Sequence, residues 1–183
     1  MAEKRGKRRF LTIIGILVII VLIVVGAKIF GSKAPIKPMI LNAIELRQTT
    51  EPLKKANMIS ELDDLVSQAD NAHVTEQWEA LVECLATGCH DGLYSEFILA
   101  IALEYQDKLP HSALIINIIS TNRYWGSESV IEFSRAMTLV DEDIQKLDSR
   151  KIEKKWDEIV ECNGVCAEKN DLVFDLVGLI MQA

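Results

Sequence analysis

Two stretches, QWEALVEC at residues 77–84 and KWDEIVEC at residues 155–162, repeat one pattern at a numbering offset of 78 (155 − 77 = 78). Each contains a tryptophan, an acidic residue, two adjacent aliphatic residues, a glutamate and a cysteine in the same order. The tryptophan and the aliphatic residues have the spacing of one helix face. A glycine, a second cysteine and an apolar segment follow both stretches. The sequence therefore predicts two hairpins in which a turn bracketed by cysteines joins two helices.

Apolar residues elsewhere recur every three or four positions, as in amphipathic helices. This spacing predicts helices with apolar positions over 53–69, 74–85, 93–101 and 130–147. Ser129 and Glu132 fit a capping box at the start of the last of these helices. Residues 113–119 (ALIINII) could be a buried strand, because they are short and rich in β-branched residues. Since no other segment could pair with them, we predict a buried helix there.

The four cysteines form two local pairs, Cys84 with Cys89 and Cys162 with Cys166. Outside the cytoplasm, two local disulfides are the simplest interpretation of such pairs. Each would join the end of one helix to the start of the next and would add roughly 2 kcal/mol of stability. Crossed pairings stay open, because four cysteines allow three connectivities.

Two alternatives assign chemistry to these cysteines. Four thiolates could bind a metal ion, with His90 as a spare ligand, but the two pairs lie far apart in the chain (162 − 89 = 73), whereas ligands of zinc sites usually lie closer together. A thiol-redox protein would be expected to carry C-x-x-C, which the chain lacks. His73 and Glu76 share a helix face but have no second ligand pair, and a solvent-facing first turn explains them better. We therefore predict no catalytic residues, no metal site and no cofactor.

An uncharged and mostly aliphatic run, FLTIIGILVIIVLIVVGA, occupies residues 10–27 after a basic opening. At a rise of about 1.5 Å per residue the run spans roughly 27 Å. Ile29 and Phe30, with the aliphatic stem of Lys28, extend it to the thickness of a bilayer core, about 30 Å. We predict a single transmembrane helix over residues 10–30, which places this part of the chain in the lipid bilayer.

A cleaved signal peptide shows a similar pattern, but three details favour a retained anchor. The apolar run is longer than the core of a signal peptide, roughly 7–15 residues. A cut after the small residues Ser32 and Ala34 would place Pro35 directly after the cleavage site. The polar, small-residue region that precedes a cleavage site is also missing before Lys28. The protein is therefore expected to be a single-pass membrane protein.

Residues 1–9 form a basic segment, which the positive-inside rule places in the cytoplasm. Residues 31–38 form a linker with two prolines, which favour an extended backbone that reaches at most about 25 Å. Residues 39–183 are expected to form one helical domain outside the cytoplasm, close to the membrane. The predicted fold is thus all-α: an N-terminal single transmembrane helix, followed by a helical bundle or a short α-solenoid of helix hairpins.

The exposed domain is strongly acidic. The chain carries −7; residues 1–9 contribute +4 and three lysines in residues 28–37 contribute +3, so residues 38–183 carry −14 (−7 − 4 − 3). This charge disfavours binding to nucleic acid or to anionic lipid headgroups. We expect a membrane-anchored, non-catalytic protein-interaction domain, an adaptor or accessory subunit, whose protein partner is neutral or basic. The alternative is a cysteine-based metal-binding or thiol-redox protein.

Overall fold

The computed structural model describes residues 35–124, 130–162 and 168–183. The basic segment 1–9 and the predicted transmembrane helix 10–30 lie outside the described residues, as do Ser129 of the predicted capping box and Cys166. Within the described part of the chain, no helix is both long enough and apolar enough to cross a bilayer. Residues Pro35–Ala183 form one compact unit.

The described residues form helices and no strands, as predicted. The helices are α2 (Ile36–Gln48), α3 (Pro52–Ala69), α4 (Ala72–Thr87), α5 (Asp91–Glu104), α6 (Ser112–Tyr124), α7 (Val130–Gln145), α8 (Arg150–Cys162) and α9 (Lys169–Gln182). The ambiguous segment 113–119 lies inside α6 and is helical. Its buried residues are spaced as on one helix face, since Leu114 and Ile115 are followed four positions later by Ile118 and Ile119.

Helix α2 begins earlier than the sequence indicated. The predicted linker ended at Pro38, but Ile36, Lys37 and Pro38 form the first turn of α2. Proline is tolerated there because the first backbone N–H groups of a helix have no partner within the helix. The end of the predicted linker, from Ile36 to Pro38, therefore belongs to the helical domain.

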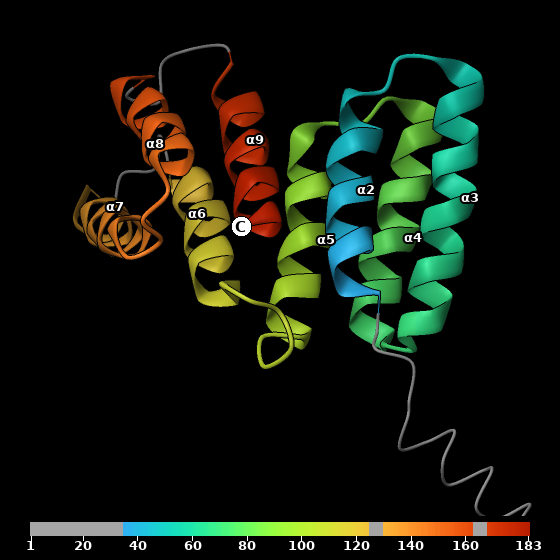
Figure 1. Cartoon of the computed structure of the whole chain (residues 1–183). Coiled ribbons are helices and arrows are strands. Elements are labelled where there is room, and N and C mark those ends of the chain that lie inside the picture. The colour runs from blue at the N-terminus through green and yellow to red at the C-terminus, as the bar shows by residue number, and fades with distance from the viewer. Residues whose placement is uncertain (1–34, 125–129, 163–167) are drawn as a thin grey trace, which may run out of the picture. The chain divides into compact units, whose positions relative to one another are not determined.

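The helices from α2 to α9 form two layers, visible in Figure 1 as successive pairs of ribbons. One layer consists of α3, α2, α9 and α8 in that order, and the other of α4, α5, α6 and α7. Each helix packs against its neighbours in its own layer and against one helix of the other layer. Two central pairs, α2 with α5 and α9 with α6, lie between two outer pairs, α3 with α4 and α8 with α7.

Helices α2 to α5, the first unit, and α6 to α9, the second unit, correspond in order. Helices α7, α8 and α9 begin at the same numbering offset of 78 from α3, α4 and α5: Val130 after Pro52, Arg150 after Ala72, and Lys169 after Asp91. Within each unit, every helix packs against the next one and the fourth packs against the first. The repeat is therefore a bundle of four helices, larger than the hairpin recognised in the sequence.

The cores of the two units also correspond. Buried residues of α3 and α4 recur at the offset of 78 as buried residues of α7 and α8: Leu62 and Val140, Val66 and Ile144, Val74 and Ile152, Trp78 and Trp156, Leu81 and Ile159. The turns that follow α3 and α7 correspond as well, because Asp70 and Asp148 each adopt a left-handed conformation with φ of 47°. Equivalent residues thus perform equivalent packing in both units.

The offset differs in the central helices. Buried residues of α2 recur in α6 at an offset of 75, as Met39 and Leu114 do, because the connection that follows α6 is longer than the one that follows α2. Buried residues of α5 recur in α9 at an offset of 79, as Phe97 and Leu176 do, although the two helices begin 78 positions apart.

The two units meet through the same helices. Helix α2 packs against α9, and α5 packs against α6. Because α2 corresponds to α6 and α5 corresponds to α9, these two contacts are equivalent to each other. An interface that uses the same surface of both partners closes on itself, whereas the repeats of a solenoid stack head to tail. Of the two predicted arrangements, the packing is that of a helical bundle.

Candidate functional site

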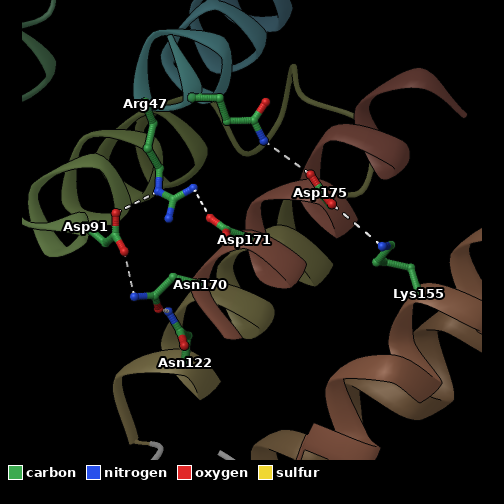
Figure 2. A network of polar contacts seen from close by, with 8 residues as sticks. Arg47, Asp91, Asn122, Lys155, Asn170, Asp171 and Asp175 are labelled. Atoms are coloured by element: carbon green, nitrogen blue, oxygen red, sulfur yellow. Dashed lines mark hydrogen bonds and ion pairs between the residues drawn. The ribbon is translucent and has the colours of Figure 1, made fainter. Parts of the chain in front are cut away.

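A polar network lies where the central helices meet at one end of the bundle (Figure 2). Arg47, in the last turn of α2, binds Asp91 on α5 with Nε to Oδ1 at 2.7 Å, and Asp171 on α9 with Nη1 to Oδ1 at 2.6 Å. Its guanidinium also lies 4.7 Å from the centre of the Phe174 ring. The positions suit the helix dipoles, because the cation is near a helix C-terminus and both carboxylates are in first helical turns. Arg47 therefore links the two units.

The charges of this network stabilise each other. Burial lowers the pKa of Arg47, but the hydrogen bonds to Asp91 and Asp171 outweigh it, and the pKa is raised. The hydrogen bond from Arg47 lowers the pKa of Asp91, and a second bond from Asn170 lowers it further. Both groups are thus held in their charged forms, as expected of a structural ion pair.

The network continues across the repeat. Asn170 donates Nδ2–H to Asp91 Oδ2 at 2.7 Å, and Asn122 donates Nδ2–H to Asn170 Oδ1 at 3.1 Å. By the offsets of the central helices, Asn122 takes the position of Arg47, and Asn170 takes the position of Asp91. An ion pair in the first unit thus corresponds to an amide pair in the second. The sequence analysis did not identify this network.

A groove of about 560 Å³ lies between α2 and α9 on one layer of the bundle. Its apolar lining consists of Leu41, Ile44, Phe174, Gly178 and Leu179, and its polar lining of Glu45, Gln48, Lys155, Asp175 and Gln182. Gln48 donates a hydrogen bond to Asp175 at 3.3 Å across the groove, and the ammonium group of Lys155 lies 3.6 Å from Asp175. Figure 2 shows Lys155 and Asp175 on facing helices. The groove thus has an apolar floor and a charged rim.

Gly178 explains why the groove is open. The residue that corresponds to it in the first unit, at the offset of 79, is Leu99, which is buried. A Cβ atom added to Gly178 would meet Ile44 Cδ1 at 3.9 Å, an ordinary contact distance. In the first unit, the side chain of Leu99 on α5 is thus buried. In the second unit, Gly178 occupies the corresponding position on α9, beside α2, and has no side chain. The groove is therefore an asymmetry in an otherwise repeated structure.

The groove continues around the end of α2. A second hollow, of about 510 Å³, is lined by Glu45, Gln48, Thr49, Thr50, Glu51 and Lys54 and shares its first two residues with the groove. Lys54 binds Glu45 at 2.7 Å, and both side chains are about half exposed. The extension is polar, with two carboxylates and one ammonium group.

The first pair of predicted disulfide residues lies at the α4–α5 turn. Cys84 and Cys89 are thiols in the structure, on either side of Gly88, whose φ of 105° suits glycine. Cys89 Sγ donates to the carbonyl oxygen of Leu81 at 3.6 Å. Burial, together with a hydrogen bond to Cys84, raises the pKa of Cys89 to about 12. The disulfide between these two residues stays a prediction.

The second pair is described only in part. Cys162 ends α8 and takes part in a disulfide bond, whereas Cys166 lies outside the described residues. The predicted bond between these two residues is therefore not tested.

In residues 35–124, 130–162 and 168–183, no group of three or more His, Cys, Asp or Glu side chains could hold a metal ion. Cys84 is near the end of α4 and Cys89 is in the α4–α5 connection, while Cys162 is on α8, which packs against α7 and α9. His73 pairs with Glu104 through Nδ1 at 3.0 Å. His73, in the first turn of α4, and Glu76, three residues later, are exposed, as their solvent-facing interpretation predicts.

The tryptophans are core residues, as predicted: Trp78 is 2% exposed and Trp156 is 3% exposed. Their hydrogen-bond partners, Asp63 and Asp141, were not predicted from the sequence. These aspartates obey the same offset as the tryptophans, so extending the comparison to the preceding helices would have found them.

Comparisons with protein-family models, with curated proteins and with solved structures found no match for this chain.

Proposed function

We propose that the chain is a membrane-anchored, non-catalytic adaptor or accessory subunit, whose helical domain binds another protein outside the cytoplasm. The single observation that supports this proposal best is the groove between α2 and α9. Apolar surface that is not covered within a domain is a common feature of protein-interaction sites.

The character of the groove agrees with a protein ligand. It lies between two helices and carries side chains of both charge signs at its rim. Leu41 and Leu179 are partly exposed in its floor, beside the buried Ile44 and Phe174. The net charge of −14 on residues 38–183 favours a neutral or basic partner and steers a basic one toward the domain. The predicted linker would keep the domain near the membrane surface, where membrane-bound partners are found.

Site-specific photo-cross-linking in native membranes tests this function. A photoreactive residue would replace Leu41 or Gln182 in the groove, and Ser60 or Glu83 on the outer helices as matched controls. We expect both groove positions to form an adduct with the same protein and the control positions to form none. Equal adducts from all four positions, or none from the groove, would show that the groove is not a binding site.

A further inference from the structure

We propose that the α2–α9 groove binds a short amphipathic helix of a partner protein, with its apolar face on the groove floor and lysine or arginine side chains directed toward Glu45 and Asp175. This inference rests on the proposed function and specifies the chemistry of the partner.

The shape of the groove favours a helix. Its lining residues extend from Leu41 to Gln48 on α2 and from Phe174 to Gln182 on α9, which is roughly 10–12 Å along each helix. Apolar side chains at positions i, i+3 or i+4, and i+7 of a ligand helix would cover this length. An extended peptide is disfavoured, because the backbone groups of α2 and α9 are bonded within their helices and offer no sheet edge.

The rim offers carboxylates that a cation can reach. Glu45 is paired with Lys54 through an exposed contact at 2.7 Å, and such surface pairs are weak and exchange readily. Asp175 is paired with Lys155 at 3.6 Å, but Lys155 makes a shorter contact, at 2.8 Å, with Glu158. An incoming lysine or arginine could therefore replace Lys155 at Asp175 while Lys155 keeps Glu158.

Charge argues against two other occupants. A second copy of this chain would bring another set of residues 38–183 with a net charge of −14, and an anionic membrane surface would bring phosphate groups. Both would be repelled by the domain. Since the position that corresponds to Gly178 holds the buried Leu99 in the first unit, we expect the partner helix to bind at one site per chain.

The test uses the full chain in mild detergent and a labelled probe peptide of about 14 residues. The peptide carries leucines at every third or fourth position and lysines on the flanks; a second peptide has the same composition in a scrambled order. Fluorescence anisotropy should show that the amphipathic peptide binds at least about 10-fold more tightly than the scrambled one. Equal affinity of the two peptides would overturn the inference, because charge alone would then explain binding.

Two sets of variants locate the site. Gly178→Leu places the leucine of the other unit in the groove and should reduce binding to the level of the scrambled peptide, whereas Ser60→Leu on α3 should not. The double variant Glu45→Gln and Asp175→Asn should weaken binding by roughly 3- to 10-fold, and Glu76→Gln with Glu83→Gln on α4 is the matched control. If Gly178→Leu does not fold, the charge variants alone test whether the peptide binds in the groove.

Further outcomes separate this inference from the proposed function. Unchanged binding in the folded Gly178→Leu variant, or in the charge variants, overturns the inference. A dimer in analytical ultracentrifugation that Gly178→Leu dissociates would identify a second copy as the occupant and also overturn it. If Leu41 and Gln182 cross-link to a protein in membranes although the two peptides bind equally, the proposed function holds and the helical basic ligand is wrong.

Discussion

Trp78 donates its indole N–H to the carboxylate of Asp63 at 2.9 Å, across the α3–α4 hairpin. The same relationship recurs in the second unit, where Trp156 donates to Asp141 at 3.1 Å across the α7–α8 hairpin. Both tryptophans are buried, so each aspartate supplies the partner that a buried indole requires. The repeat thus preserves a polar contact at the edge of each core as well as the apolar positions.

Removal of either aspartate should destabilise the domain formed by residues 35–183. Asp63→Ala and Asp141→Ala should each lower the free energy of unfolding by about 1–2 kcal/mol, because a buried N–H loses its acceptor. Urea denaturation measures this change. Exposed acidic neighbours on the same helices provide controls: Asp64→Ala and Glu142→Ala should change stability by less than about 0.5 kcal/mol. Equal effects of the aspartates and their controls would contradict a role for the indole bonds.

Stability should fall in acid partly because of Asp91. Its pKa is lowered in the folded state by Arg47, so its contribution is complete above the unfolded pKa of about 4 and is lost as the pH falls through the folded value. Asp91→Asn should be less stable than the parent at pH 7 and should lose less stability below about pH 4. Thermal unfolding between pH 2 and 7 measures both effects. Asp64→Asn on the exposed face of α3 should keep the parent slope; an unchanged slope for Asp91→Asn would exclude this linkage.

Gly178 and Gly88 should respond oppositely to alanine. Gly178→Ala should raise the free energy of unfolding by about 0.5–1 kcal/mol, because alanine is the better helix former and its Cβ meets Ile44 at an ordinary distance. Gly88→Ala should lower it by about 1–2 kcal/mol, because a φ of 105° is unfavourable for a residue with a Cβ. Urea denaturation of both variants tests the pair. A destabilising Gly178→Ala would show that the groove is tighter than its geometry indicates.

The cysteines should act as local structural links. In oxidised protein we expect no free thiols, and peptide mapping should find Cys84 bonded to Cys89 and Cys162 bonded to Cys166. Replacing both members of either pair by alanine should lower stability by about 1–3 kcal/mol, since short loops give modest stabilisation, and partner binding should survive. Reduced thiols that hold a stoichiometric metal ion, with loss of the fold when the metal is removed, would instead support the metal-binding alternative.

The predicted anchor should make the chain an integral membrane protein. Because residues 10–30 form an apolar run after a basic segment, we expect the protein to stay in the membrane fraction after alkaline carbonate treatment, with its carboxyl terminus outside the cytoplasm. A tag after Ala183 should be digested by protease added from that side. Release by carbonate, or protection of the tag, would contradict the topology.

Local features of the domain were predictable because they depend on local spacing. Helices α3 and α7 follow from apolar residues at helical intervals, and the burial of Trp78 and Trp156 follows from aliphatic neighbours on the same face. Helix α2 was less clear, because prolines at positions 35 and 38 also fit an extended linker. Its core residues Met39 and Leu46 gain their role only by packing against other helices.

The candidate site could not be predicted, because its members come from distant segments. Arg47 meets Asp91 and Asp171 only once α2, α5 and α9 are packed together, and no local spacing specifies which charges will meet. The different numbering offsets of the central helices also hid their correspondence, since changes in connection length break a constant register.

By itself, the sequence determined the helical class, the acidic charge of the domain and the repeat that contains the two tryptophans. Helical periodicity can be read from the spacing of neighbouring residues, and net charge is a sum over residues, so neither depends on tertiary structure. The tertiary structure alone decided that the repeats close into a two-layer bundle and that a groove remains between α2 and α9. The groove exists because Gly178 faces Ile44, where the other unit buries Leu99. The difference between glycine and leucine opens a groove only once α2 and α9 are packed together.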